Sequence, residues 1–369
     1  MDTTQKNLIY LLFCAVNGLT PESERVRAMD MANLYRLSGL HKVRGAVCIA
    51  LEKAGVQNED FHQEMKKAVR KNILLDIERQ SILADFERHG IWYMPLKGCI
   101  LKDLYPGNGM REMSDNDILF DKEKRYTVRD IMMAHGYSIE LFGKGNHDVY
   151  HKPPVLKFEM HVALFHRIHA DNTYYRYYRD FRRLLKKDGN NNYGYHLSDE
   201  DFYVFMTVHE YKHYSTSGTD IRSLLDCYVY EKAMGDKLDY EYIREQMEQL
   251  GIANFERNRR TLAFKVFSSA VLPELTETEQ SMLTYYLTSL TNAHYENSID
   301  NKLQTRSKSE YLLELIFPSM EVMKGSVGFV EKCGMLYPLG VVWRLFRAFF
   351  CNGIITIKKI LLIMRYHEK

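Results

Sequence analysis

The sequence is poor in the features that mark a disulfide-bonded or zinc-scaffolded protein. Its 369 residues contain six cysteines, which lie far apart and form no Cys-x-x-Cys pair. Cysteines paired at short spacing are the usual sign of a disulfide framework or a structural zinc site. The cysteine pattern therefore argues against both scaffolds and predicts a protein of the reducing cytoplasm.

Uninterrupted apolar runs are also missing. The first residues, MDTTQKNLIYLLFCAVNG, contain a brief apolar stretch but neither a basic leader nor a small-residue cleavage site, so we expect no secretory signal. The tail, residues 336–369, is apolar, but basic residues interrupt it before any uncharged run reaches the roughly eighteen residues of a membrane span. These basic residues are Arg344, Arg347, Lys358, Lys359 and Arg365. We predict that the tail packs against the body of the protein; a basic amphipathic helix that contacts a membrane surface or a partner protein is the alternative.

Neither sign of charge predominates. Lysine and arginine number 50 against 48 aspartates and glutamates, a net charge of +2. There is therefore no protein-wide field that would attract a nucleic acid. Proline is scarce, at eight residues, and we find no low-complexity linker and no internal repeat. A chain of this length has room for two or three compact units.

Residues 97–120, KGCILKDLYPGNGMREMSDNDILF, end in an apolar strand that carries Asp115 and Asp117. Side chains alternate along a β-strand, so these two carboxylates project from one face while Asn116 and Ile118 project from the other. Two like charges so close together repel each other and need a counter-ion. A hard divalent cation with oxygen ligands, Mg²⁺ or Mn²⁺, meets this need and keeps open positions for substrate phosphates. The pattern predicts a site for metal and phosphate.

The residues around this strand predict a small α/β unit. Residues 91–94 are typical of a short strand that ends at Pro95 and a turn at Gly98, where glycine lets the backbone approach a phosphate closely. Asp121 is placed to cap a helix that stops at Gly136. Two further strand-like runs follow, SIELF and VLKFEMHVALF.

The second of these runs has an alternating pattern. Phe158 and Met160 fall on one face, and Lys157, Glu159 and His161 fall on the other. Glu159 is therefore placed to become a third carboxylate on a strand beside the aspartate pair.

The order of these features resembles that of the minimal nucleotidyltransferases of the DNA polymerase beta superfamily. More specifically, the sequence is similar to a branch of uncharacterised nucleotidyltransferase family proteins, which show a Leu-Lys-Gly turn, an arginine before a DxD strand, and a carboxylate-x-His strand. The matching residues are Leu96-Lys97-Gly98, Arg111, Asp115-Asn116-Asp117-Ile118-Leu119-Phe120 and Glu159-Met160-His161. Later segments also occur in the family's order: His209 and His213, then LLDCYVY, LDYEYIREQMEQLG, LIFPSMEVM and YPLGVVWRLFR.

The resemblance implies an α+β fold. Its centre would be a minimal nucleotidyltransferase core, a small mixed sheet with helices, at about residues 89–170. Helical regions are expected on both sides, at residues 1–88 and 171–325, followed by apolar and basic tail helices at 326–369.

The resemblance also implies a reaction, the transfer of a nucleoside monophosphate from a nucleoside triphosphate (NTP) to an acceptor hydroxyl. Asp115, Asp117 and Glu159 would be the catalytic residues and would bind Mg²⁺ or Mn²⁺. The residues expected to bind the nucleotide are Lys97, Gly98, Arg111 and His161. The acceptor is open, because a small metabolite, a sugar, a protein side chain and an RNA end all fit. A non-catalytic protein that senses nucleotide or binds a partner is the competing interpretation, since a fold alone does not establish activity.

Two positions depart from the family pattern. The phosphate turn usually contains Gly-Ser or Gly-Gly, whereas this chain has Gly98-Cys99, which loses a hydroxyl contact. Asn116 stands between the two aspartates, where an apolar residue is usual. Neither change removes a metal ligand.

A rival motif lies further along the chain. Residues 209–213, HEYKH, match the HExxH pattern in which two histidines bind zinc and the glutamate acts as a base, so a zinc metalloprotease is a minor alternative. Lys212 places a cation inside the motif, and no third ligand is evident in the sequence. His209 and His213 also continue an apolar helix face that contains Phe202 and Phe205. We therefore predict that both are packed or hydrogen-bonded core histidines.

Overall fold

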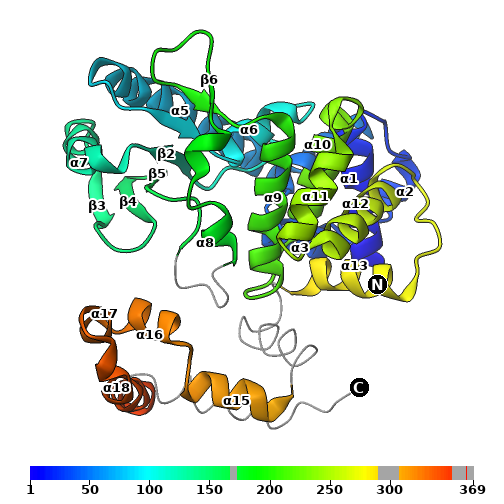
Figure 1. Ribbon diagram of the computed structural model, residues 1–369. Helices are drawn as coiled ribbons and strands as arrows, with labels where there is room; N and C mark the ends of the chain where they lie inside the picture. The colour runs from blue at the N-terminus through cyan, green and yellow to red at the C-terminus, as the bar shows by residue number, and fades with distance from the viewer. Residues whose placement is uncertain (167–172, 290–306, 351–362, 364–369) are drawn as a thin grey trace.

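The computed structural model describes residues 1–166, 173–289, 307–350 and Ile363 (Figure 1). The N-terminal part is helical and comprises α1 (Thr3–Val16), α2 (Ser23–Arg27), α3 (Met31–Leu40), α4 (Arg44–Lys53) and α5 (Glu59–Arg88). The long α5 helix begins where the Asn58 side chain accepts a hydrogen bond from the backbone N–H of Phe61. Leu75, Ile82 and Phe86 recur on one side of α5 and are buried, so this side of the helix supports the sheet.

Five strands form one mixed sheet in the order β1-β2-β5-β4-β3. The strands are β1 (Tyr93–Pro95), β2 (Asn116–Phe120), β3 (Ser138–Leu141), β4 (His147–Lys152) and β5 (Leu156–His161). Strands β2 and β5 run parallel, and the other neighbours are antiparallel. The sequence indicated four of these strands and missed β4, because its three buried residues are consecutive and give no alternating pattern. All five lie within residues 89–170, and the fold is α+β as the resemblance implies.

Helices cover one face of this sheet. Between β1 and β3 the chain forms α6 (Gly98–Leu101), η1 (Lys102–Leu104), η2 (Lys122–Lys124) and α7 (Arg125–Ala134). Ile118 and Phe120 of β2 and Phe158 of β5 pack in one hydrophobic cluster with α5 and with Val128 and Met132 of α7. The opposite face carries the polar residues of the site beside Met94 of β1 and Leu119 of β2, which pack in a second hydrophobic cluster.

The helical region after the sheet shares its core with the N-terminal helices. It contains α8 (Thr173–Tyr177), η3 (Phe181–Leu184), a hairpin of β6 (Lys186–Lys187) and β7 (Tyr195–His196), α9 (Asp199–Tyr214), α10 (Ile221–Met234), η4 (Gly235–Lys237), α11 (Tyr240–Gln249), α12 (Ala253–Phe267) and α13 (Glu277–Thr288). Leu8 and Leu12 of α1 belong to the same hydrophobic cluster as Leu225 of α10 and Leu262 of α12. Two regions far apart in the sequence thus form one helical body, and the predicted domain boundaries stay predictions.

The tail forms α15 (Lys308–Ile316), α16 (Met320–Ser326), α17 (Gly328–Lys332), η5 (Gly334–Leu336) and α18 (Tyr337–Phe350). Met323, Val330 and Val341 are buried in a small cluster of their own. Val342 is 64% exposed and Phe346 58% exposed. The described tail helices thus bury a few residues among themselves and leave apolar side chains of α18 exposed. The prediction that the tail packs against the body is therefore wrong for its described part.

Lys358, Lys359 and Arg365 lie outside the described residues. Within the described residues, none of the helices has the length and apolar character needed to cross a membrane.

Candidate functional site

The register of β2 and β5 brings three carboxylates together. Asp117 on β2 pairs in parallel register with Glu159 on β5, and Asp115 lies just before β2 begins. Buried and half-buried side chains alternate along β5, so Glu159 and His161 project from the same face. All three carboxylates line one cavity of about 890 Å³ between the sheet and α9. The structure thus assembles the carboxylates that the sequence singled out, and their role as metal ligands stays a prediction.

Cys99 and Asn116, the two residues that depart from the family pattern, are hydrogen-bonded to each other on the side of β2 away from these carboxylates. The Cys99 thiol donates a hydrogen bond to the side-chain oxygen of Asn116 at 3.2 Å, and both residues are buried. The Asn116 amide donates to the Leu75 carbonyl of α5, and Arg79 of α5 donates to the same Asn116 oxygen. Such partners are needed because a buried polar group left without a hydrogen bond costs about 1 to 3 kcal/mol. Asn116 therefore connects β2 to α5, and Cys99 connects β2 to α6, on the side away from the cavity.

Lys157 supplies positive charge to the carboxylates. Its Nζ atom lies 2.8 Å from Glu159 Oε1 and 3.9 Å from Asp115 Oδ2. Burial acts to lower the pKa of Lys157, but the hydrogen bond to Glu159 and the nearby negative charges outweigh it and raise this pKa. The ammonium therefore stays protonated at neutral pH and reduces the repulsion between Asp115 and Glu159.

Asp115 and Asp117 have opposite pKa shifts although they are two residues apart. Burial acts to raise the pKa of Asp117, but the hydrogen bond that His161 Nε2 donates at 3.1 Å and the charge of Lys97 lower it below its usual value. Burial, reinforced by the charges of Asp117 and Glu159, raises the pKa of Asp115 to about 6. The electrostatic cost of the carboxylate cluster is therefore concentrated at Asp115.

We expect Asp115→Asn to stabilise the metal-free protein above pH 6 by roughly 1 to 3 kcal/mol. In the unfolded chain Asp115 ionises near 3.8, and in the folded protein near 6. Between these values the folded protein keeps a proton that the unfolded chain has lost, so the stability of the parent falls as pH rises. An asparagine has no proton to lose.

The measurement is the melting temperature of both proteins in EDTA from pH 4 to pH 8. The difference between the variant and the parent should grow from pH 4 to about pH 6 and then stay constant. A difference in melting temperature that does not change with pH would show that folding does not raise the pKa of Asp115.

Two of the residues expected to bind the nucleotide, Lys97 and His161, line the cavity. Lys97 has a φ of 27° and Lys42, on the same cavity wall, has a φ of 54°. In the described part of the chain these are the non-glycine residues with positive φ. Strained backbone of this kind costs on the order of 1 to 3 kcal/mol and clusters at ligand-binding and catalytic sites. Both strained residues line this cavity, which favours it as the candidate site.

Lys97 makes a contact that the sequence did not predict. Its ammonium donates a hydrogen bond to Nδ1 of His209 on α9 at 2.5 Å. Burial lowers the pKa of Lys97 to about 8, and burial together with the charges of Lys97 and Lys212 lowers the pKa of His209 well below its usual range. The proton therefore belongs to Lys97 at neutral pH, and the cavity presents a cation beside a neutral imidazole. No sequence signal joins two residues 112 positions apart.

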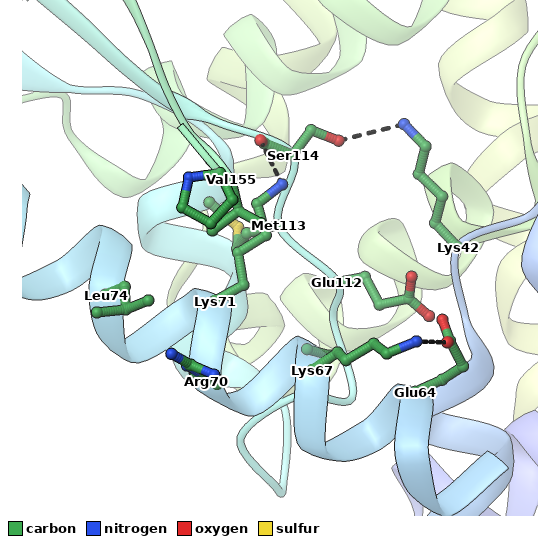
Figure 2. A pocket seen from close by; sticks show the side chains of 12 residues that line it. Lys42, Glu64, Lys67, Arg70, Lys71, Leu74, Glu112, Met113, Ser114 and Val155 are labelled. Atoms are coloured by element: carbon green, nitrogen blue, oxygen red, sulfur yellow. Dashed lines mark hydrogen bonds and ion pairs between the residues drawn. The ribbon is translucent and has the colours of Figure 1, made fainter. Parts of the chain in front are cut away.

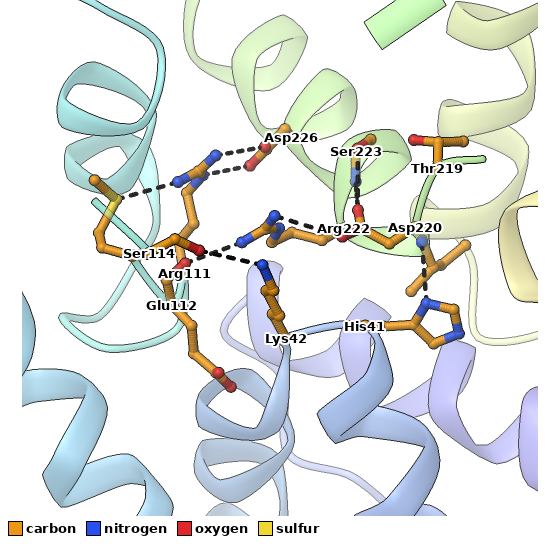
Figure 3. Close-up of polar contacts among 12 residues, drawn as sticks. His41, Lys42, Arg111, Glu112, Ser114, Thr219, Asp220, Arg222, Ser223 and Asp226 are labelled. Carbon is orange, nitrogen blue, oxygen red and sulfur yellow. Dashed lines mark hydrogen bonds and ion pairs between the residues drawn. The ribbon is translucent and has the colours of Figure 1, made fainter. Parts of the chain in front are cut away.

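The other two expected nucleotide ligands, Gly98 and Arg111, lie behind the cavity wall. A Cβ atom on Gly98 would lie 2.8 Å from Met113 Cε, the end of a flexible side chain, so a larger residue here would require Met113 to shift. Arg111 donates through Nε and Nη2 to the two carboxylate oxygens of Asp226 on α10, at 2.8 and 2.9 Å (Figure 3). Both side chains are buried. The buried ion pair of Arg111 therefore connects the segment before β2 to α10. A contact between Arg111 and the nucleotide stays a prediction.

The HExxH helix places both histidines at the cavity wall, where each one is hydrogen-bonded. His209 and His213 line the carboxylate cavity, and their ring centroids are 4.8 Å apart. The carboxylate oxygens of Glu210 are both engaged in the protein interior, one by Arg259 at 2.7 Å and the other by the Tyr286 hydroxyl. The glutamate of a metalloprotease must instead face the water on the metal. The position of Glu210 therefore argues against a zinc protease.

His147 joins the site although the sequence did not single it out. It opens β4 directly across from His161 in antiparallel register, and the centroids of the two rings are 5.0 Å apart. Its Nε2 atom lies 3.7 Å from Glu159 Oε2. Because β4 lacks an alternating pattern, neither the strand nor the face of this histidine could be read from the sequence.

A second groove opens beside the cavity (Figure 2). It has a volume of about 500 Å³, and Lys42 and Ser114 line both the groove and the cavity. Lys42 donates a hydrogen bond to the Ser114 hydroxyl at 3.2 Å, and Lys71 of α5 donates to the Ser114 carbonyl at 2.8 Å. The charged lining consists of Lys42, Lys67, Arg70 and Lys71 against Glu64 and Glu112. The excess of cations favours an anionic ligand in this groove.

The small mixed sheet and its carboxylates agree with the nucleotidyltransferase class that the motifs indicated. The model of a family described as uncharacterised nucleotidyltransferase matches residues 27–268, and the chain belongs to this family. The match runs from α3 to α12 and includes the whole five-stranded sheet. No curated protein and no solved structure matches the chain.

Proposed function

We propose that the protein transfers a nucleoside monophosphate from an NTP to an acceptor hydroxyl, in a reaction that requires a divalent metal ion. The observation that carries this proposal is the pairing of Asp117 with Glu159 in register, with Asp115 beside them on the wall of the same cavity. A volume of about 890 Å³ is within the range of small-molecule sites and suits a nucleotide. The family membership supports the reaction class.

Three carboxylates on one face fit a hard divalent cation. Asp115, Asp117 and Glu159 would hold Mg²⁺ or Mn²⁺, whose oxygen preference matches this donor set. Bound there, the ion neutralises negative charge on the triphosphate and on the leaving pyrophosphate. Lys157 already provides one positive charge at this place, through its contacts with Glu159 and Asp115.

The chain's own residues would bind the triphosphate, orient Asp117 and take up the proton of the acceptor hydroxyl. Lys97 would hold the triphosphate through its ammonium, since it faces the same cavity as the carboxylates. His161 keeps Asp117 in its present orientation by the hydrogen bond to Oδ1. Glu159 would accept the proton of the acceptor hydroxyl, because its carboxylate stands on the strand next to Asp117.

A non-catalytic module on the same fold is the second candidate. Such a protein has no need to keep a third carboxylate aimed at the aspartate pair, and a Glu159 side chain that pointed away would favour it. Glu159 instead shares a strand face and a register position with Asp117, which favours an enzyme.

We expect the protein to bind an NTP in Mg²⁺ and to lose this affinity in EDTA. Without a cation, the three carboxylates repel the triphosphate. Isothermal titration with each of the four NTPs, with and without Mg²⁺, measures the effect and identifies the preferred base. Equal affinity in EDTA would contradict the proposed site. Transfer itself is tested with labelled NTPs and a cell extract, in which the labelled product identifies the acceptor.

A further inference from the structure

A cluster of two imidazoles and one carboxylate lies beside the aspartate pair. His147, Glu159 and His161 each offer a ligand atom, and these atoms all lie within 4.8 Å of one another. Glu159 Oε2 is 3.7 Å from His147 Nε2 and 3.9 Å from His161 Nε2. Around a tetrahedral zinc ion, bonds of about 2.0 Å place neighbouring ligand atoms about 3.3 Å apart. The three side chains are therefore close to the spacing that one metal ion requires, and a bound ion would replace the proton that His161 Nε2 donates to Asp117 in the metal-free protein.

The sheet fixes this arrangement. His147 and His161 are directly opposite each other on β4 and β5, and Glu159 follows two residues away on the same face of β5. The two oxygens of Glu159 have separate partners, because Oε1 contacts Lys157 at 2.8 Å while Oε2 faces the imidazoles. Lys157 can therefore keep its contact while Oε2 binds a cation.

The type of ligand selects the metal. Mg²⁺ prefers oxygen ligands and keeps much of its water, whereas imidazole nitrogen suits first-row transition metals such as Zn²⁺ and Fe²⁺. Two histidines and one carboxylate on one face leave further positions open on such an ion. The aspartate pair alone offers only oxygen atoms.

We propose that His147, Glu159 and His161 form a binding site for one divalent transition-metal ion, which shares Glu159 with the oxygen site of Asp115 and Asp117 and differs from it in its nitrogen ligands. This inference deepens the proposed function and rests on it for the role of the ion. The ion would lie beside Glu159, where the acceptor hydroxyl is expected. The binding itself does not depend on nucleotide. The site thus takes a mixed pair of ions, with Mg²⁺ arriving alongside the triphosphate and the transition metal held by the protein.

The test is a titration of the full-length, metal-free protein with Zn²⁺ and, separately, with Mg²⁺, in the absence of nucleotide. We expect one Zn²⁺ per chain, bound at least on the order of 100 times more tightly than Mg²⁺. His147→Gln and His161→Gln should each weaken Zn²⁺ binding on the order of tenfold to 100-fold. His213→Gln is the matched control, because it removes another imidazole of the same cavity and should leave the affinity unchanged. Circular dichroism and melting temperature establish that each variant is folded.

Two results would overturn the proposal: Zn²⁺ affinity that is unchanged in both folded variants, and affinity that falls equally in His213→Gln. The outcome is separable from that of the proposed function. Zn²⁺ binding without any NTP binding or transfer would leave this site standing and remove the nucleotidyltransferase reaction. Transfer in Mg²⁺ alone, with no Zn²⁺ bound by the parent protein, would do the reverse.

Discussion

Asp117→Asn should lower nucleotidyl transfer by roughly 10²- to 10⁴-fold, because a metal ion at a phosphoryl centre supplies several kcal/mol of charge stabilisation and each 1.36 kcal/mol is tenfold in rate. The side chain keeps its size and its ability to accept the hydrogen bond from His161. Only the charge that would hold the cation is removed. The measurement pairs the rate of transfer with the melting temperature of the same preparation.

The fold of Asp117→Asn should survive, with a small loss of stability rather than a gain. The carboxylate of Asp117 is stabilised by His161 and Lys97, whose influence holds its pKa below the usual value against the effect of burial. Asp130→Asn is the matched control, because Asp130 is 64% exposed on α7 and pairs with the neighbouring Arg129 on the surface. Full transfer by Asp117→Asn would sink the proposed mechanism, and lost transfer by Asp130→Asn would show that the assay reports folding.

Arg111→Ala should cost about 3 to 5 kcal/mol of the free energy of unfolding, the usual effect of removing one partner of a buried ion pair. Among the described residues, the Tyr105 hydroxyl would then be the remaining hydrogen-bond donor to the buried Asp226 carboxylate. Urea denaturation measures the loss. Arg244→Ala is the matched surface change, because Arg244 and Glu241 are 61% and 78% exposed and their pair should be worth less than about 1 kcal/mol.

A double variant separates the two roles of Arg111. Arg111→Met combined with Asp226→Leu removes both buried charges and should recover most of the stability that Arg111→Ala loses. If Arg111 acts only through its ion pair with Asp226, the double variant should bind NTP with the affinity of the parent protein. A folded double variant without NTP affinity would instead establish the phosphate contact that the family position of Arg111 suggests.

Local patterns were enough to predict the carboxylate face. Alternation along β2 and β5 places Asp115, Asp117 and Glu159 on one side of the sheet, since this depends only on the period of a strand. The strand boundaries were also close, with β1 at Tyr93–Pro95 where residues 91–94 were expected.

Contacts between distant segments could not be predicted in this way. Arg111 looked like a free cation in the sequence, because Asp226 lies 115 residues further on. His209 sits on an apolar helix face, yet that face borders a cavity whose opposite wall comes from the sheet. Asn116 departs from the family pattern, in which an apolar residue is usual at this position. The Cys99 thiol and the Arg79 guanidinium both donate hydrogen bonds to its side-chain oxygen. In each case the partner, and not the residue itself, decides the role.

The segment from Ile91 to Leu101 has a mechanical consequence. Its side chains belong in turn to two separate hydrophobic cores, with Tyr93 and Cys99 in the core under the sheet and Met94 and Leu101 in the helical core. The segment therefore connects the core under the sheet to the helical core that includes α9. Lys97 lies within this segment in a strained conformation, and its side chain lines the cavity. The position of the Lys97 ammonium is thus fixed from two sides, by residues that are buried in one core or the other.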